Sequence, residues 1–113
     1  MSLQNDLDYL RHISEEINLI IRLTSQYHVD DILKDDVMQR AVRASLEVIG
    51  EASKYISSQT KNKYSGVSWR ELSDTRNRII HEYFGLDFEQ IKEIIEFDIP
   101  ELKTQIDKII SEL

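Results

Sequence analysis

The stretch LQNDLDYLRHISEEINLII occupies residues 3–21 and carries an aliphatic residue at every third or fourth position. These positions are Leu3, Leu7, Leu10, Ile13, Ile17, Ile20 and Ile21. An α-helix has about 3.6 residues per turn, so this spacing places all of them along one face. The pattern predicts a long helix over residues 3–26 that buries this face against other helices.

The same periodicity recurs in three further segments, which are separated by short polar stretches. We expect helices over residues 37–58, 69–83 and 87–113. The first connector, YHVDDILKDD (27–36), has room for a short helical turn at most, and KNKYSG (61–66) interrupts the pattern again. Helices of this number and length predict an all-α fold, an antiparallel bundle of four to five helices.

Local signals mark where these helices begin and end. SWRE (68–71) matches the capping box that satisfies free amides at a helix start, and Asp87 with Gln90 can cap the last helix in the same way. Gly85 is expected to end the third helix. Pro100 lacks an amide hydrogen and clashes with the preceding turn, so it should kink or split the last helix.

The composition restricts the class of protein. A chain of 113 residues that is 41% hydrophobic and 31% charged predicts a single folded domain over residues 1–113. The absence of cysteine excludes disulfides and thiolate metal sites. The N-terminus has no apolar signal-peptide segment, and no run of eighteen apolar residues occurs, so we expect a cytoplasmic protein without a membrane span.

The charge is distributed unevenly along the chain. The net charge of −7 argues against a nonspecific nucleic-acid binder, because phosphate binding depends on Lys and Arg. Residues 61–81, however, carry five Lys and Arg against two Asp and Glu, whereas the segments on either side are acidic. This single cationic segment could hold an anionic ligand locally.

The cationic segment leads into RNRIIHEYF (76–84), which concentrates polar chemistry in nine positions. On a regular helix, Arg76 and Tyr83 lie about 20° apart, whereas His81 lies about 140° from Arg76. Two alternatives would bring the three side chains together. Either the helix ends or distorts before His81, or two copies of the chain pair so that both motifs line one cleft.

The chemistry of these residues fits metal-free cleavage of RNA. Arg76 offers a planar fork of donors for a phosphate, and His81 can transfer protons near neutral pH. Asn77 could orient a phosphate oxygen or the imidazole, and the Tyr83 hydroxyl could donate to phosphate or stack on a base. The ribose 2′-hydroxyl would then supply the nucleophile. The spacing by itself leaves open a histidine that is merely packed or at the surface.

RNRIIHEY resembles the R-N-x-x-x-H-x-Y motif of the HepT-like ribonuclease toxins, a branch of the HEPN-domain superfamily. Three longer segments resemble the same family. They are QRAVRASLEVIGEASKYIS (39–57), VSWRELSDTRNRIIHEYFGLD (67–87) and FDIPELKTQI (97–106). The resemblance therefore covers nearly the whole chain and includes every position of the motif.

The resemblance implies a HEPN-type helical bundle that forms a homodimer with the motif at its interface. It implies a metal-independent endoribonuclease toxin without a cofactor, in a type VII-like toxin–antitoxin pair. Arg76 and His81 would be catalytic, with Asn77 and Tyr83 in support. A partner antitoxin, a minimal nucleotidyltransferase, would inactivate the toxin by transferring AMP to Tyr83. The alternative is a noncatalytic helical module that binds such a partner or presents a substrate to it.

Other polar residues have simpler interpretations. His12 and His28 have no partner at metal-ligand spacing, so we expect surface or packing roles. Arg43, Glu47 and Glu51 are spaced four apart, which predicts a solvated ladder of ion pairs, with a place beside the cleft as the alternative.

The segment around Trp69 also allows two interpretations. Trp69 and Tyr64, beside Lys63 and Arg70, could form a stacking and cationic platform for RNA. Trp69 just after a helix cap is more simply explained as an anchor in the core.

Overall fold

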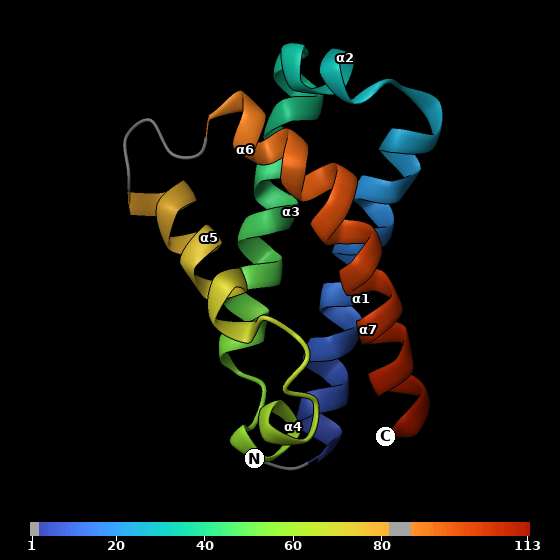
Figure 1. Ribbon diagram of the computed structural model, residues 1–113, viewed down its shortest axis with the longest axis vertical. Helices are drawn as coiled ribbons and strands as arrows, with labels where there is room; N and C mark the ends of the chain where they lie inside the picture. The colour runs from blue at the N-terminus through green and yellow to red at the C-terminus, as the bar shows by residue number, and fades with distance from the viewer. Residues whose placement is uncertain (1–2, 82–86) are drawn as a thin grey trace.

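The computed structural model describes residues 3–81 and 87–113. Four long helices run alternately up and down the molecule (Figure 1), and no strand occurs in these two ranges. They are α1 (Leu3–Gln26), α3 (Asp36–Lys54), α5 (Trp69–His81) and α7 (Ile99–Glu112). The predicted all-α fold of HEPN type is confirmed.

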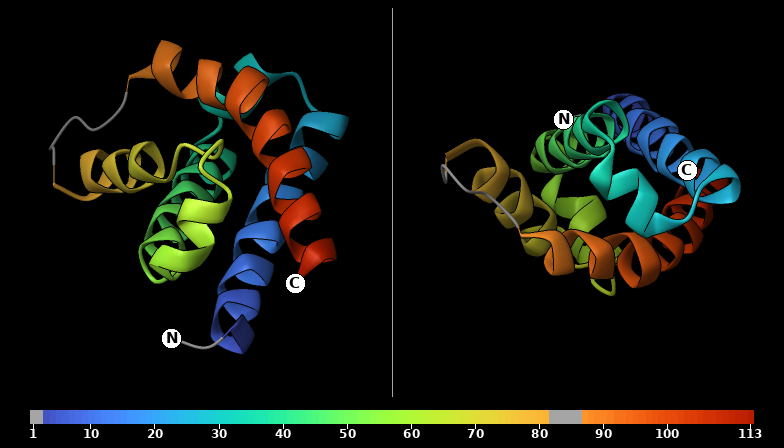
Figure 2. Two further views of the ribbon diagram at one scale, coloured as in Figure 1. Left: turned by 60° about the horizontal axis from the view of Figure 1, so that its bottom comes forward. Right: turned by 90° about the horizontal axis from the view of Figure 1, so that it is seen from above.

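Shorter elements connect the long helices. They are α2 (Val29–Lys34), α4 (Ser58–Lys63), α6 (Phe88–Glu93) and the π-helix η1 (Ile94–Asp98). Seen from above, α2 crosses one end of the bundle (Figure 2). The first connector is thus more helical than expected, because His28 caps α2 and Val29, Ile32 and Leu33 are buried.

The order of packing sets α5 apart from the rest of the bundle. Helix α3 lies between α1 and α5, and α7 packs on α1. The aliphatic face predicted for α1 is confirmed, since Leu10, Ile13, Ile17 and Ile20 are at most 1% exposed. Helix α5 therefore rests mainly on α3 and leaves a groove on its other side, towards α7.

The predicted end of the second long helix is wrong. We expected a helix over 37–58 and a break over 61–66, but α3 ends at Lys54 and α4 then runs from Ser58 to Lys63. The cause is the Ser57 hydroxyl, which caps α4 by accepting from the Thr60 amide at 3.3 Å. This cap begins a new helix where the periodic pattern alone would continue the old one.

A buried carboxylate joins the start of α1 to this junction. Asp6 is 0% exposed and accepts from the Ser57 amide at 2.9 Å, the Ser57 hydroxyl at 2.6 Å and the Thr60 hydroxyl at 2.6 Å. Burial alone would raise the pKa of Asp6, but these three hydrogen bonds outweigh it and hold the pKa below its ordinary value of 3.8. Asp6 therefore acts as an ionised tether between segments more than fifty positions apart.

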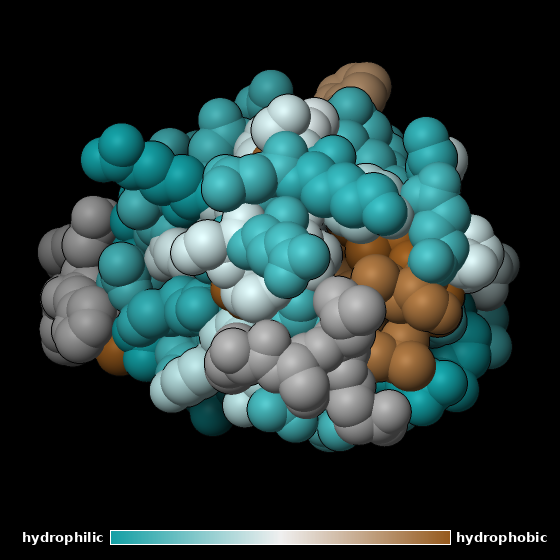
Figure 3. All heavy atoms as spheres, turned by 90° about the horizontal axis from the view of Figure 1, so that it is seen from below, coloured by the Kyte–Doolittle hydropathy of each residue, from teal (hydrophilic) through white to brown (hydrophobic). Residues whose placement is uncertain are grey.

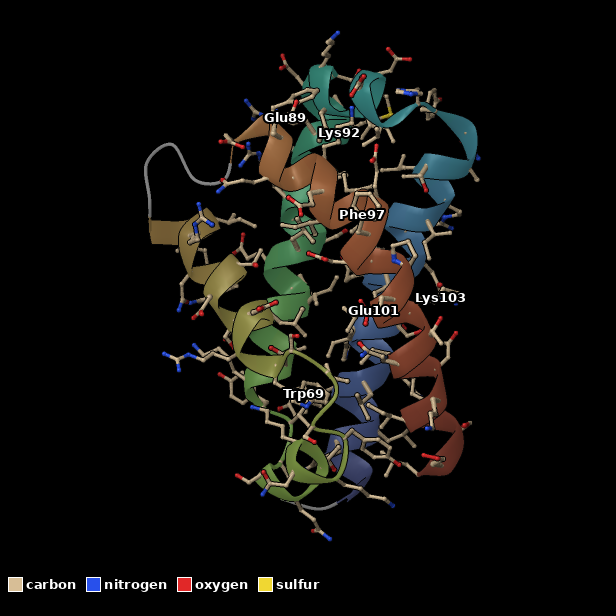
Figure 4. The ribbon with its side chains drawn as sticks, in the orientation of Figure 1. Trp69, Glu89, Lys92, Phe97, Glu101 and Lys103 are labelled. Carbon is tan, nitrogen blue, oxygen red and sulfur yellow. The ribbon has the colours of Figure 1, made fainter. Side chains whose placement is uncertain are left out.

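The last predicted helix is split near Pro100, as expected. Asp87 and Gln90 form the predicted capping box of α6, and Pro100 lies in the first turn of α7, where a missing amide hydrogen is tolerated. The π-helix η1 joins the two helices. Phe97 within it is 66% exposed and lies on the front face of the molecule (Figure 4).

The face of the molecule seen from below is mainly polar. Hydrophilic residues cover most of this view, with a hydrophobic area on its right side and a smaller one at its top edge (Figure 3). Among the residues that the structure describes, no helix is both long enough and apolar enough to cross a membrane.

Candidate functional site

Arg76 lies where α5 approaches α3 closely. A Cβ atom at Gly50 of α3 would collide with Cβ of Arg76 and lie 2.5 Å from the Leu72 carbonyl oxygen. A side chain at position 50 would therefore push the two helices apart. Gly50 is the residue that allows α5, and with it Arg76, to lie against α3.

Two neighbours hold the guanidinium of Arg76. Its Nε lies 3.0 Å from Oε2 of Glu51, on the adjacent helix, and its Nη1 donates to Oδ1 of Asn77 at 3.0 Å. The side chain of Arg76 is 20% exposed and that of Glu51 is 39% exposed. Asn77 therefore contacts Arg76 within the chain. That Asn77 also orients a phosphate oxygen of RNA stays a prediction.

Of the other two motif residues, the structure describes the backbone of His81 but not Tyr83. Helix α5 continues through His81, so the alternative in which the helix ends before this residue is wrong. Position 81 therefore lies about 140° around the helix from position 76. The His81 side chain, Tyr83 and Gly85 lie outside the described residues, and the predictions for them stay predictions.

Helix α3 and Tyr55, the residue that follows it, carry an apolar stripe that faces away from the core. We call it the α3 stripe and define it as Val37, Ala41, Ala44, Val48 and Tyr55. Val37 is 77% exposed, Val48 41% and Tyr55 48%, although Tyr55 stacks on Tyr9 with ring centres 5.3 Å apart. The spacing of four, three, four and seven is that of a helical seam. Val37 and Val48 lie outside the core, because the core side of α3 is formed by residues such as Val42 and Ile49.

The ladder predicted for α3 is wrong at Glu51. This carboxylate pairs with Arg76 of another helix, and Arg43 Nε donates to Gln39 Oε1 at 2.6 Å. Sequence reasoning offered a place beside the cleft only as the alternative for Glu51. The available signal was the neighbouring glycine, since a glycine inside a helix indicates a close contact with another helix at that point.

Trp69 is a core anchor and does not form an RNA platform. It is 8% exposed, and its indole Nε1 donates to the Tyr64 carbonyl at 3.1 Å (Figure 4). The Tyr64 hydroxyl donates to Glu112 at 2.8 Å, and this hydrogen bond raises the pKa of Tyr64. Both aromatic residues are thereby tied to their own chain.

The remaining histidines behave as expected of surface and packing residues. His12 is exposed, and His28 accepts from the Asp30 amide at 3.2 Å as the cap of α2. Asp30 pairs with Lys92 at 3.1 Å and so links α2 to α6. The described residues contain no group of three or more side chains that could hold a metal ion.

One groove next to α5 is acidic. It has a volume of about 110 Å³, its floor includes Leu46 and Leu72, and Glu71, Asp98 and Glu101 line it. Burial, followed by repulsion from neighbouring carboxylates, raises the pKa of Asp98. Such a lining repels phosphate, so this groove is not a candidate site for RNA. The Arg76 side of α5 is the candidate.

Comparison with known proteins gives one family. The model of a family described as "Ribonuclease HepT-like" matches residues 13–109. A relative from Caldanaerobacter subterraneus subsp. tengcongensis, named "Putative RNase", is 40% identical over 90% of this chain and 91% of its own length. A second from Thermococcus cleftensis, named "Probable ribonuclease HepT", is also 40% identical, over 90% of this chain and 93% of its own length. No solved structure gives a significant match.

Proposed function

Because the chain belongs to the HepT-like ribonuclease family, we propose that it is an endoribonuclease that uses Arg76 and His81 to cleave RNA. The observation that carries this proposal is the arrangement of the Arg76 guanidinium, which Glu51 and Asn77 hold on one side. The names of the relatives support RNA as the substrate. Such a guanidinium can donate two parallel hydrogen bonds to a phosphate.

The proposed reaction is an internal transfer within RNA. The 2′-oxygen of a ribose attacks the adjacent phosphorus while His81 accepts the hydroxyl proton. The bond from phosphorus to the 5′-oxygen of the next nucleotide breaks, and this oxygen takes up a proton. The products are a 2′,3′-cyclic phosphate and a 5′-hydroxyl. Arg76 stabilises the negative charge that develops on the phosphoryl oxygens. We propose that these two residues suffice without a metal ion.

We further propose that two copies of the chain form the cleft. Positions 76 and 81 lie about 140° apart on one α5, so a single helix points them in different directions. The α3 stripe offers an uncovered apolar seam next to Glu51 and Arg76. Pairing of two α3 stripes would bury this seam and bring both copies of the motif to one interface.

The regulatory part of the proposal concerns Tyr83. We propose that the chain is a toxin whose cognate antitoxin, a minimal nucleotidyltransferase, transfers AMP from ATP to the Tyr83 hydroxyl oxygen. Pyrophosphate and the hydroxyl proton are released. Tyr83 lies seven positions after Arg76, so a helix continued to it would place both on one face. The added phosphodiester would then compete with RNA for Arg76. Mass spectrometry after co-expression with the antitoxin, using Tyr83→Phe as control, tests this step.

The decisive experiment is incubation of the purified chain with labelled total RNA in EDTA. We expect cleavage that leaves cyclic phosphate ends, with a loss of about 10²–10⁴-fold in rate for His81→Ala. Arg76→Lys should also be poorly active, because an ammonium cannot reproduce the two parallel donors. Activity that disappears in EDTA and returns with magnesium would show that the metal-free mechanism is wrong. Intact RNA with every preparation would favour the noncatalytic module.

A further inference from the structure

The contact between Arg76 and Glu51 is unusual for a site that binds phosphate. Nε of Arg76 and Oε2 of Glu51 lie 3.0 Å apart, and both atoms are shielded from solvent. The contact is an ion pair and not a hydrogen bond, because neither atom has a hydrogen-bond partner of good geometry among the described residues. Each of these two atoms is desolvated, and this ion pair is its contact in place of water.

Neither stability nor RNA affinity explains such a pair. The two side chains are partly exposed, and an ion pair of this kind contributes about 0–1 kcal/mol to folding. Desolvation of the two shielded atoms offsets part of this gain. A carboxylate next to the arginine also weakens its attraction for a phosphate, because it offsets the positive charge. The contact therefore reduces simple RNA binding while it adds little to the fold.

Its geometry suggests what it does contribute. The guanidinium has five N–H groups, and Glu51 faces the one on Nε, while Asn77 accepts one from Nη1. Among the residues that the structure describes, the second Nη1 hydrogen and both Nη2 hydrogens have no partner. Nη1 and Nη2 form the outer end of the group, an edge that can make a two-point contact with a phosphate.

We propose that Glu51 is a positioning residue, which fixes the Arg76 guanidinium so that its outer edge faces the scissile phosphate. This inference rests on the proposed function and adds a residue to the same site. By partly neutralising Arg76, Glu51 also makes its interaction with the singly charged phosphodiester weaker. The attraction between Arg76 and the phosphate is strongest when a second negative charge develops in the transition state. This attraction therefore raises kcat more than it tightens substrate binding.

The helix that carries Glu51 also provides a matched control. Glu47 lies one turn earlier on α3 and carries the same charge. Glu51→Gln and Glu47→Gln each remove one negative charge and keep the size of the side chain. Glu51→Asp keeps the charge but withdraws the carboxylate by one methylene, so it separates contact from charge. Denaturant unfolding of all three variants confirms that each is folded before further measurement.

The first test does not depend on RNA cleavage. ¹⁵N relaxation of the Arg76 Nε–H group reports whether the guanidinium is held. We expect this group to be ordered in the wild type and in Glu47→Gln, and clearly more mobile in Glu51→Gln and Glu51→Asp. An Arg76 Nε–H group that is equally ordered in Glu51→Gln and in the wild type would overturn the proposal.

The second test separates kcat from KM in RNA cleavage. We expect Glu51→Gln to lower kcat by about 10- to 100-fold without raising KM, since a misplaced catalytic group has an effect of this size. A general effect of charge would instead lower KM alike in Glu51→Gln and Glu47→Gln and leave kcat unchanged, and this result would refute the positioning role. If the wild type leaves RNA intact, the proposed function fails, and the relaxation measurement still decides whether Glu51 holds Arg76.

Discussion

Replacement of Asp6 should destabilise the fold far more than replacement of an ordinary helix aspartate. Asp6 accepts three hydrogen bonds of 2.9, 2.6 and 2.6 Å from Ser57 and Thr60, and it is 0% exposed. Hydrogen bonds to an ionised group contribute about 1.5–3 kcal/mol each, and desolvation of the carboxylate offsets part of this sum. We therefore expect Asp6→Ala to lower the free energy of unfolding by about 2–5 kcal/mol.

The charge of Asp6 makes this contribution depend on pH. The pKa of Asp6 is lowered in the folded chain relative to 3.8. A lowered pKa means that the stabilisation is complete above the unfolded value and is lost as the pH falls through the folded value. The difference in stability between the wild type and Asp6→Ala should therefore be constant near neutral pH and shrink below about pH 3.8.

Urea denaturation at a series of pH values measures both quantities. Asp8→Ala is the matched control, because Asp8 lies on the same helix but is exposed. We expect a change within about 0.5 kcal/mol for this variant. If Asp6→Ala and Asp8→Ala unfold at the same urea concentration at pH 7, the tether between α1 and α4 does not stabilise the fold and our reasoning is wrong.

Three further predictions concern α3 and α5. Gly50→Ala should destabilise the chain by about 1–3 kcal/mol and slow RNA cleavage. Gly66→Ala is the control and should do neither, because its Cβ would meet nothing within 4 Å. Equal stability of the two variants in denaturant unfolding would contradict the close approach of α5 to α3. Trp69→Ala should cost about 3–5 kcal/mol in denaturant unfolding, and a change typical of a surface residue would refute its role as an anchor. Val48→Asp should convert a dimer into a monomer of 13.3 kDa by light scattering, and a wild type that is already monomeric at micromolar concentration would exclude the proposed pairing.

The four long helices were predictable because their signal is local. The spacing that defines α1 lies within the helix itself, and its predicted range of 3–26 agrees with Leu3–Gln26. The end of α3 was not predictable in this way. Ile56 continues the apolar pattern, but Asp6 and Ser57, 51 positions apart, start a new helix immediately afterwards. A contact over this distance leaves no periodic trace.

The two faces of α3 show a second limit of periodicity. Val42 and Val48 are the same residue type on one helix, yet the first is 0% exposed and the second 41%. Aliphatic residues on both sides of a helix cannot be assigned to the core by spacing alone, because a second apolar face is equally suited to a partner. Spacing alone therefore could not show which apolar residues of α3 lie outside the core.

The sequence motif predicted the candidate site, but the residue that holds Arg76 from another helix became visible only in the packing of the helices. Arg76 and Asn77 are neighbours in sequence, so their contact could be anticipated. Glu51 lies 25 positions before Arg76, and its spacing from Glu47 and Arg43 gave an equally good local explanation. Only the packing of α5 on α3 shows that Glu51 pairs with Arg76 and not with its neighbours on α3.

Gly50 and Glu51 link the packing of α3 to the chemistry of Arg76. Gly50 admits the backbone of α5, and the next residue, about 100° further around the helix, places its carboxylate beside the guanidinium. Both contacts come from rigid helices, which hold a catalytic group more accurately than loops do. Glu51 also lies next to the α3 stripe, three positions after Val48 and four before Tyr55. In the proposed dimer, the helix that orients Arg76 would therefore also form the interface, so that pairing and orientation of the catalytic arginine depend on the same element.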